Sequence, residues 1–202
     1  ILQFLRACGK MPVDQDGSVG ALATYFNLPI NGVLHDAAEL GTLVHDWIAA
    51  DHGACPYPDV SDAPAYFWEM INEWDKFKQT HEVVPLHSEV TLWSHQYGYA
   101  GTADGFWMVD GVPMLIDVKT SRNTWDEHYM QLAALGACDS LLLEPTDGHW
   151  VEDVVPSFSE YALLHLRPSD TDNNGNYMEP FCKLIVVDPV SYTHLRAHET
   201  GR

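Results

Sequence analysis

Two aspartates and a lysine in the stretch from Tyr97 to Ser121 offer the side chains that metal-assisted hydrolysis needs. They are Asp104, Asp117 and Lys119. Neighbouring carboxylates repel each other unless a proton, a cation or solvent offsets their charge. Magnesium takes oxygen ligands and commonly binds through one or two carboxylates. A lysine beside them adds a positive group for an anionic oxygen or a water, so the three residues together suit attack on a phosphodiester.

A β-hairpin would bring these residues together. Asp110-Gly111 lies between two apolar runs, and Asp-Gly favours a two-residue turn with positive φ at both positions. With that turn, Asp104 faces Asp117, and facing side chains at such a position lie about 4.5–5.5 Å apart. Side chains two residues apart share a face, so we expect Asp104, Asp117 and Lys119 on one face of the hairpin.

A third carboxylate is expected on the preceding strand. The run from Ser88 to Ser94 predicts a strand that turns back through His95–Gly98. In that register Glu89 lies opposite Asp104. Glu89 could therefore line the site or be an ordinary strand residue, and Glu82 is the weaker substitute.

Three helices are predicted from apolar spacing. The first runs from 36 to 50, with Asp36 as its N-cap and His45 beside its apolar stripe. Without further evidence, the position of His45 favours a boundary histidine that forms a local hydrogen bond. The second helix runs from 65 to 80. The third runs from 125 to 143 and carries Gln131 beside its packing side.

Two later apolar runs, Tyr161–Leu166 and Leu184–Val187, predict strands that extend the sheet on the side away from the first strand. Ser169–Gly175 between them predicts a flexible turn.

The order of these residues resembles the RecB-like exonuclease branch of the PD-(D/E)XK nuclease superfamily. The resemblance covers about residues 37 to 143 and rests on four motifs, which are Gly41-Thr42-Leu43-Val44-His45, Gly101-Thr102-Ala103-Asp104, Ile116-Asp117-Val118-Lys119-Thr120 and Gln131. One position departs from it, because Leu135 stands where the family's glutamine motif has a tyrosine.

The resemblance implies an α/β fold of the restriction-endonuclease type, with a mixed central sheet of about four or five strands flanked by helices. It implies that Asp104, Asp117 and the backbone carbonyl of Val118 bind Mg²⁺, or Mn²⁺ as a substitute, with help from His45 or Glu89. Lys119 would orient the attacking water or stabilise the transition state, and Gln131 would position the nucleophile or the substrate.

The implied activity is a metal-dependent deoxyribonuclease that acts as an exonuclease on linear DNA ends. Its setting would be recombination, repair or phage DNA processing in the cytoplasm of a bacterium or phage-infected cell, with an unidentified recombination or phage partner protein. Some relatives carry an iron–sulfur cluster, but the four cysteines here are scattered. We therefore expect neither a cluster nor a zinc site.

Length and composition indicate one globular domain over residues 1–189, whose N-terminus is expected to be truncated, followed by a non-native or disordered tail over 190–202. No run of about 18 apolar residues occurs, so no membrane-spanning helix is expected. Scattered thiols fit a reducing cytoplasm. The net charge of −19 is unusual for a DNA enzyme, because nucleic-acid affinity comes largely from lysine and arginine.

Two other functions fit parts of the pattern. A glycoside hydrolase also uses paired carboxylates, about 5–5.5 Å apart in retaining enzymes, and the chain has seven tryptophans. Such an enzyme does not require Lys119 beside Asp117. A non-catalytic DNA-binding or interaction module with a nuclease-like fold is the second alternative, but all three central positions carry residues that are competent for catalysis.

Overall fold

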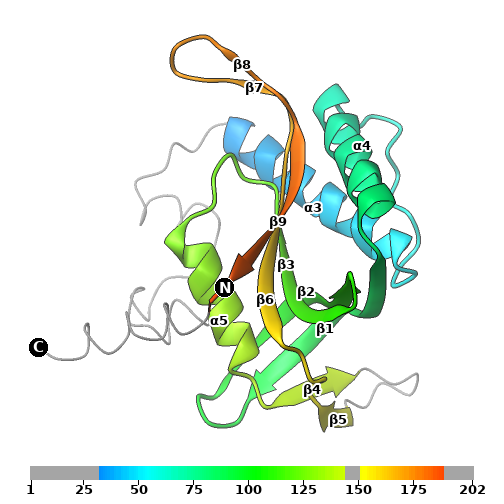
Figure 1. Cartoon of the computed structure of the whole chain (residues 1–202), viewed down its shortest axis with the longest axis vertical. Coiled ribbons are helices and arrows are strands. Elements are labelled where there is room, and N and C mark those ends of the chain that lie inside the picture. Colours follow the sequence, from blue (N-terminus) through cyan, green and yellow to red (C-terminus); the bar gives the residue numbers. More distant parts are fainter. Residues whose placement is uncertain (1–31, 144–150, 189–202) are drawn as a thin grey trace, which may run out of the picture.

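The computed structural model describes residues 32–143 and 151–188 and shows an α/β fold (Figure 1). Seven strands form one mixed sheet in the order β5-β4-β1-β2-β3-β6-β9. The helices are α3 (Gly32–Asp51), α4 (Ala65–Thr80) and α5 (Asp126–Gly136), and the strands are β1 (Val83–Ser94), β2 (Tyr99–Val109), β3 (Val112–Lys119), β4 (Ser140–Leu143), β5 (Val151–Val154), β6 (Glu160–Arg167), β7 (Asp170–Thr171), β8 (Tyr177–Met178) and β9 (Phe181–Val187).

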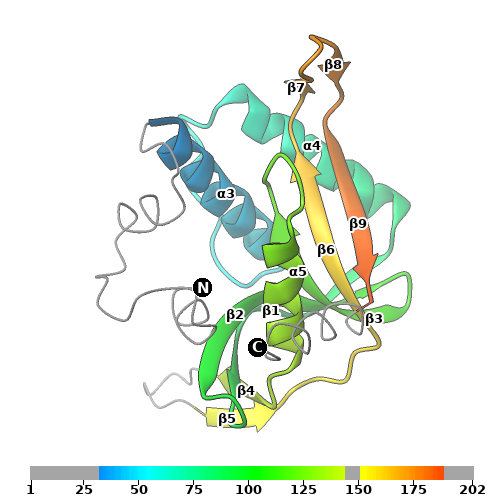
Figure 2. The same cartoon turned by 90° about the vertical axis from the view of Figure 1, so that its left-hand side faces the viewer.

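The sheet separates two apolar cores. Helices α3 and α4 cover one face and α5 covers the other (Figures 1 and 2). On α4 the residues Phe67, Met70, Ile71, Trp74 and Phe77 recur at helical spacing and are all buried. They pack with Val44 and Ile48 of α3 against one side of the sheet. Leu132 and Leu135 of α5 pack against the opposite side. None of the described helices is long and apolar enough to cross a membrane.

The central hairpin forms as the sequence predicts. Asp110 and Gly111 have φ of 51° and 80°, the positive values that the two-residue turn requires. The pairing Gly105 with Ile116 lies in the predicted register, and so does Ser94 with Tyr99 in the preceding hairpin. Strand β6 then pairs in parallel with β3, and β9 pairs with β6 at the edge far from β1, as predicted.

Several predicted bounds are wrong. The sheet has seven strands, more than the four or five expected. The third helix ends at Gly136 instead of 143, because the apolar run after it forms β4 and pairs with β1. The first helix begins at Gly32, so Asp36 lies inside it and is not its N-cap. No proline lies between Gly32 and Asp51, which lets the helix extend in both directions.

One further difference concerns the segment between β6 and β9. The stretch expected as a flexible turn, Ser169–Gly175, contributes β7 to a small antiparallel ribbon with β8. This ribbon projects beyond the sheet (Figure 2). The predicted 190–202 tail lies outside the described residues.

Candidate functional site

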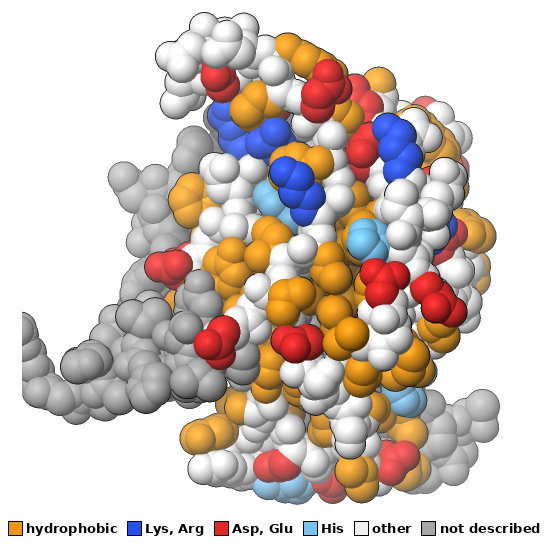
Figure 3. Space-filling model, in the orientation of Figure 1, with side chains coloured by type: hydrophobic (Ala, Val, Ile, Leu, Met, Phe, Trp, Pro, Cys, Tyr) orange, Lys and Arg blue, Asp and Glu red, His pale blue; other side chains and the backbone are white. Residues whose placement is uncertain are grey.

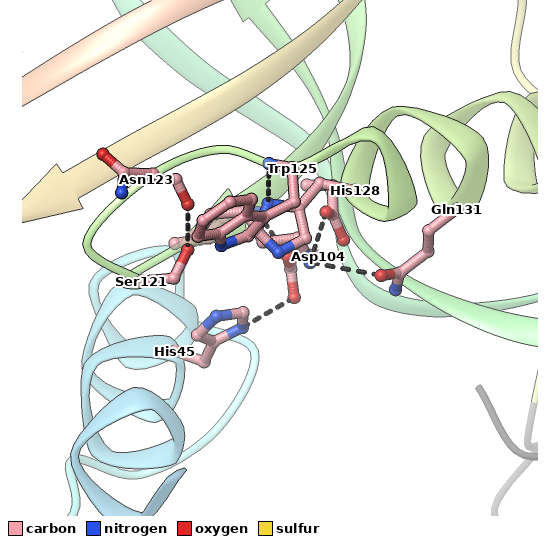
Figure 4. A network of polar contacts seen from close by, with 10 residues as sticks. His45, Asp104, Ser121, Asn123, Trp125, His128 and Gln131 are labelled. Atoms are coloured by element: carbon pink, nitrogen blue, oxygen red, sulfur yellow. Dashed lines mark hydrogen bonds and ion pairs between the residues drawn. The ribbon is translucent and has the colours of Figure 1, made fainter. Parts of the chain in front are cut away.

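Three side chains from three elements meet at one end of the sheet. They are His45 on α3, Glu89 on β1 and Asp104 on β2, and one donor atom from each lies within 4.8 Å of the other two. Nδ1 of His45 donates a hydrogen bond to Oδ1 of Asp104 across 2.9 Å (Figure 4). Among the described residues this is the group with the spacing of metal ligands. The group includes His45 and Glu89, to which the family resemblance assigned only a supporting role in metal binding.

Asp104 also binds the neighbouring strand. Its second oxygen, Oδ2, accepts a hydrogen bond from the backbone N–H of Val118 across 2.5 Å. The β2–β3 pairing ends one step earlier, at Gly105 and Ile116. The prediction that Asp104 and Asp117 form a facing pair is therefore wrong, because the side chain of Asp104 takes the place of a backbone acceptor there.

Strand β2 changes face at this point. Ala103 packs in the core under α5, whereas Trp107 packs in the core under α3 and α4. Residues four apart on a regular strand share a face, so the alternation breaks between them. Gly105 lies in this break, and a side chain there would come within 2.5 Å of the backbone oxygen of His87. The break lets Asp104 reach α3 while Asp117 stays on the α5 face.

Asp117, Lys119 and Gln131 form the second half of the site. Asp117 is only 2% exposed, and Nζ of Lys119 lies 2.5 Å from its Oδ2. That oxygen has no well-aligned hydrogen bond among the described residues, so we treat the contact as an ion pair. Nζ of Lys119 also donates to Oε1 of Gln131 across 3.3 Å (Figure 4). The ammonium is thus held between β3 and α5.

The acids of the site differ in their protonation. Burial raises the pKa of Asp117 to about 6, against the attraction of the Lys119 ammonium. Burial and the charge of Asp104 raise the pKa of Glu89 to about 7. Burial would also raise the pKa of Asp104, but the hydrogen bond and the charge of His45 hold it below its ordinary value. At neutral pH, Asp104 is therefore the carboxylate most fully charged.

The pKa of His45 shifts in the opposite direction to that of most buried histidines. Burial would lower the pKa of its imidazole, but the hydrogen bond with Asp104 and the charge of that carboxylate raise it above the ordinary value. A cation at this position would compete with that proton, because a metal binds the neutral imidazole.

Glu89 has a strained backbone. Its φ is 53°, in the left-handed region that non-glycine residues avoid at a cost of roughly 1–2 kcal/mol. The pairs on either side of it, Ser88 with Gly105 and Val90 with Ala103, keep the predicted register. The strain is therefore confined to the one residue whose carboxylate joins His45 and Asp104.

Two residues that the sequence analysis did not select lie at the start of α5, His128 near Lys119 and Trp125 beside His128. Trp125 is 53% exposed just before α5, and its backbone N–H donates to Nδ1 of His128 across 3.3 Å (Figure 4). Burial, with the charge of Lys119, lowers the pKa of His128 to about 4. His128 is therefore neutral with its proton on Nε2. The sequence could have indicated His128 as a site residue, because it lies three residues before Gln131 and therefore on the same side of the helix.

The site can hold a divalent cation next to a fixed ammonium group. An imidazole nitrogen with two carboxylates fits Mn²⁺, and the carboxylates fit Mg²⁺. Asp117 and the carbonyl of Val118 lie outside the group of three, so their assignment as ligands stays a prediction. Comparison of the sequence with known proteins found no matching family model and no matching curated protein.

Proposed function

We propose that this protein is a metal-dependent deoxyribonuclease that hydrolyses phosphodiester bonds at DNA ends, in recombination, repair or phage DNA processing. The observation that carries the proposal is the meeting, at one end of the sheet, of side chains from five elements, namely His45, Glu89, Asp104, Asp117, Lys119 and Gln131. A cation group beside a positioned lysine is the arrangement that phosphodiester hydrolysis uses.

The residues that would hold the metal are His45, Glu89 and Asp104, with Asp117 as the additional carboxylate that the resemblance implies. A bound Mg²⁺ or Mn²⁺ would polarise the scissile phosphate and lower the pKa of a bound water. The chain provides the negative charge that retains the cation. Asp104 is the firmest anchor, because the N–H of Val118 and the His45 ring fix both of its oxygens.

Lys119 would act on the phosphate itself. Its ammonium is mostly buried, with 14% of the side chain exposed, and its position is fixed by Asp117 and by Gln131. An ammonium held in place stabilises negative charge on a phosphate oxygen without reorganising. Gln131 accepts from Lys119 through Oε1, and its NH₂ group, which has no hydrogen-bond partner among residues 32–143 and 151–188, would bind a phosphate or a water.

One observation also fits a glycoside hydrolase. The pKa of Glu89 is raised and that of Asp104 is lowered, and such a split is typical of an acid/base pair. A glycosidase gives no role to the Lys119–Gln131 contact. Activity on glycosides that resists a chelator would favour this alternative, and metal-dependent loss of DNA would exclude it as the main activity.

The test uses purified protein with linear and with closed-circular DNA, each with Mg²⁺, with Mn²⁺ and with EDTA. Lys119→Ala is the site variant, and Lys76→Ala, an exposed lysine on α4, is the matched control. We expect the protein to degrade linear DNA but not the closed circle, and only when metal is present. Lys76→Ala should cleave at the wild-type rate, and Lys119→Ala should lower the cleavage rate at least about 100-fold.

Cleavage of the closed-circular DNA would support nuclease activity but show that the enzyme is an endonuclease. No cleavage by folded protein under any of these conditions would contradict the proposal and favour a non-catalytic binding role.

A further inference from the structure

A chain with a net charge of −19 must obtain its phosphate contacts from few cations. The described residues include six lysines and arginines. Four of them lie on β3, β6 and β9 or just after β3: Lys119, Arg122, Arg167 and Lys183. Figure 3 shows Lys and Arg side chains gathered in the upper half of one face, below the β7–β8 ribbon. The distribution of positive charge is therefore uneven and favours the end of the sheet that holds the site.

These residues form a row across neighbouring strands. Lys119 on β3 pairs with His165 on β6, and His165 pairs with Lys183 on β9. Arg167 lies two residues beyond His165 on the same strand face. We call Lys119, Arg167 and Lys183 the basic row. His165 lies between them but is buried, and burial lowers the pKa of its ring, so it separates the cations without adding a charge. Neighbouring strands are about 4.8 Å apart, so the row spans about 10 Å from the catalytic lysine to the sheet edge.

The basic row lies on the same face of the sheet as Asp117 and α5. Leu163 of β6 and Ile185 of β9 pack in the core under α5, and both have the strand phase of His165 and Lys183. Helix α5 ends against Tyr161, near the beginning of β6. The row lies at the opposite end of β6, beyond the start of α5.

An aromatic ring holds two of the cations in place. The guanidinium of Arg167 lies 4.7 Å from the ring centre of Phe181, and the ammonium of Lys183 lies 4.5 Å from it. The His165 ring contacts Phe181 edge-on at 5.0 Å. Contacts of this kind orient a cation without neutralising it.

Arg167 and Lys183 also lack the acidic partners that other cations have. Lys78 contacts Asp51 and Asp75, and Arg122 contacts Asp170 across 2.9 Å. Within residues 32–143 and 151–188, no carboxylate lies at ion-pair distance from Arg167 or Lys183. Nε of Arg167 is buried without a hydrogen-bond partner there. With 29 acids in the chain, two oriented but unpaired cations beside a catalytic lysine point to an anionic ligand.

We propose that the basic row binds consecutive phosphates of the DNA strand that enters the site, and so leads that strand from the β9 edge to Lys119. The proposal rests on the proposed function for the identity of the ligand. A row of about 10 Å can contact about two or three consecutive phosphates, because each strand of a duplex carries one phosphate per about 3.4 Å of helix axis and the phosphates lie further apart along the winding backbone. Contacts to phosphates are independent of sequence, as an enzyme that degrades DNA ends requires.

The test measures equilibrium binding of the full chain to labelled single-stranded and duplex oligonucleotides by fluorescence anisotropy, in EDTA so that metal-dependent cleavage does not occur. Arg167→Gln, Lys183→Gln and the double variant remove charge from the row. Lys76→Gln is the control, because it removes the same charge from α4. Thermal unfolding of each variant verifies that the fold is kept.

Each row substitution should weaken binding about fivefold at about 0.1 M salt and reduce the slope of log K against log salt by about 0.7–0.9. The double variant should show both effects added, and Lys76→Gln should bind as the wild type does. Equal binding by wild type and double variant, or equal losses in Lys76→Gln, would overturn the proposal, as would a wild type that binds neither oligonucleotide.

The two proposals can fail separately. If the wild type degrades DNA but the row variants bind DNA as tightly as the wild type, the proposed role of the basic row is wrong and the proposed nuclease activity is supported. If the row variants bind DNA more weakly but no protein cleaves DNA, the proposed role of the basic row is supported and the proposed nuclease activity is wrong.

Discussion

Asp104 connects three elements with one carboxylate. Oδ1 accepts from His45 of α3, and Oδ2 accepts from the backbone of Val118 on β3, while the residue itself belongs to β2. Both contacts favour the charged form, and together they keep its pKa low despite burial. Loss of this carboxylate would leave the Val118 N–H without that acceptor and would free the His45 ring, so Asp104 serves the structure as well as the proposed chemistry.

The positive φ of Glu89 should lower the stability of the fold while it positions the carboxylate at the site. Glycine accepts a positive φ without steric cost but loses about 0.5–1 kcal/mol of chain entropy on folding, whereas glutamine keeps the strain of roughly 1–2 kcal/mol. We expect Glu89→Gly to be more stable than Glu89→Gln by about 0.5–1 kcal/mol, measured by denaturant unfolding in EDTA.

Both variants should lose Mn²⁺ binding in calorimetry. A Gln variant more stable than the Gly variant would mean that the backbone at Glu89 is not strained.

His52 should make stability depend on pH. Its ring packs 4.5 Å from Trp107, its Nε2 is buried without a partner among the described residues, and burial lowers its pKa to about 4. Above the unfolded pKa of about 6.5, both states are neutral and the proton has no effect. As the pH falls from there towards 4, only the unfolded state takes up the proton, so stability is lost in this window.

We expect wild type to lose about 1–2 kcal/mol more than His52→Gln between about pH 7.5 and about pH 5, in denaturant unfolding at each pH. Parallel pH profiles for the two proteins would show that the pKa of His52 is not lowered in the folded state.

At the scale of elements, the end of α5 decides the topology of the sheet. The apolar run after Gly136 fits a helix and a buried strand equally well by periodicity. The chain forms β4 there because Leu141 and Leu142 complete β1 on its open side. Leu141 becomes 1% exposed, a burial that continuing the helix would not provide.

Gly136 allows α5 to approach β6. A Cβ at this position would lie 2.0 Å from Cε1 of Tyr161. Helix propensity alone predicts that Gly136→Ala stabilises by about 1 kcal/mol, but overpacking predicts a loss of about 1–3 kcal/mol. We expect a net loss in thermal or denaturant unfolding.

The double variant Gly136→Ala with Tyr161→Leu should lose less than the sum of the two single variants, because the smaller side chain removes the clash. Additive losses would place the strain elsewhere.

For the whole molecule, net charge is the dominant electrostatic property. A charge of −19 destabilises the compact state through self-repulsion, which salt screens. The melting temperature should therefore rise with NaCl. Mg²⁺ or Mn²⁺ should raise it further at equal ionic strength, because binding to the folded state adds about 2.7 kcal/mol at a concentration of 100 Kd.

Differential scanning fluorimetry measures both increments. Glu89→Gln should keep the NaCl effect and lose most of the specific effect of Mn²⁺. If the two salts act alike in wild type at equal ionic strength, the group of His45, Glu89 and Asp104 does not bind the cation.

Local chemistry in the sequence determined the central hairpin and much of the candidate site. Asp110-Gly111 specifies its turn through φ alone, and that turn fixes the register that brings β2 beside β3. The regular spacing of apolar residues on α4 predicted its bounds. The position of Glu89 followed from the strand register, whereas Gln131 was selected through the family resemblance of its motif. Glu89 lies beside Asp104 and Gln131 contacts Lys119.

Only the tertiary structure decided how the acids divide between two groups. Asp104 turns to His45 and to the Val118 N–H, and Asp117 turns to Lys119. This division arises because strand β2 changes face beside Gly105 and because Glu89 adopts a positive φ. Neither feature has a local sequence signal, since both depend on contacts with α3 and with the neighbouring strand. The same holds for the basic row, whose members are distant in sequence and meet only because β6 and β9 pair beside β3.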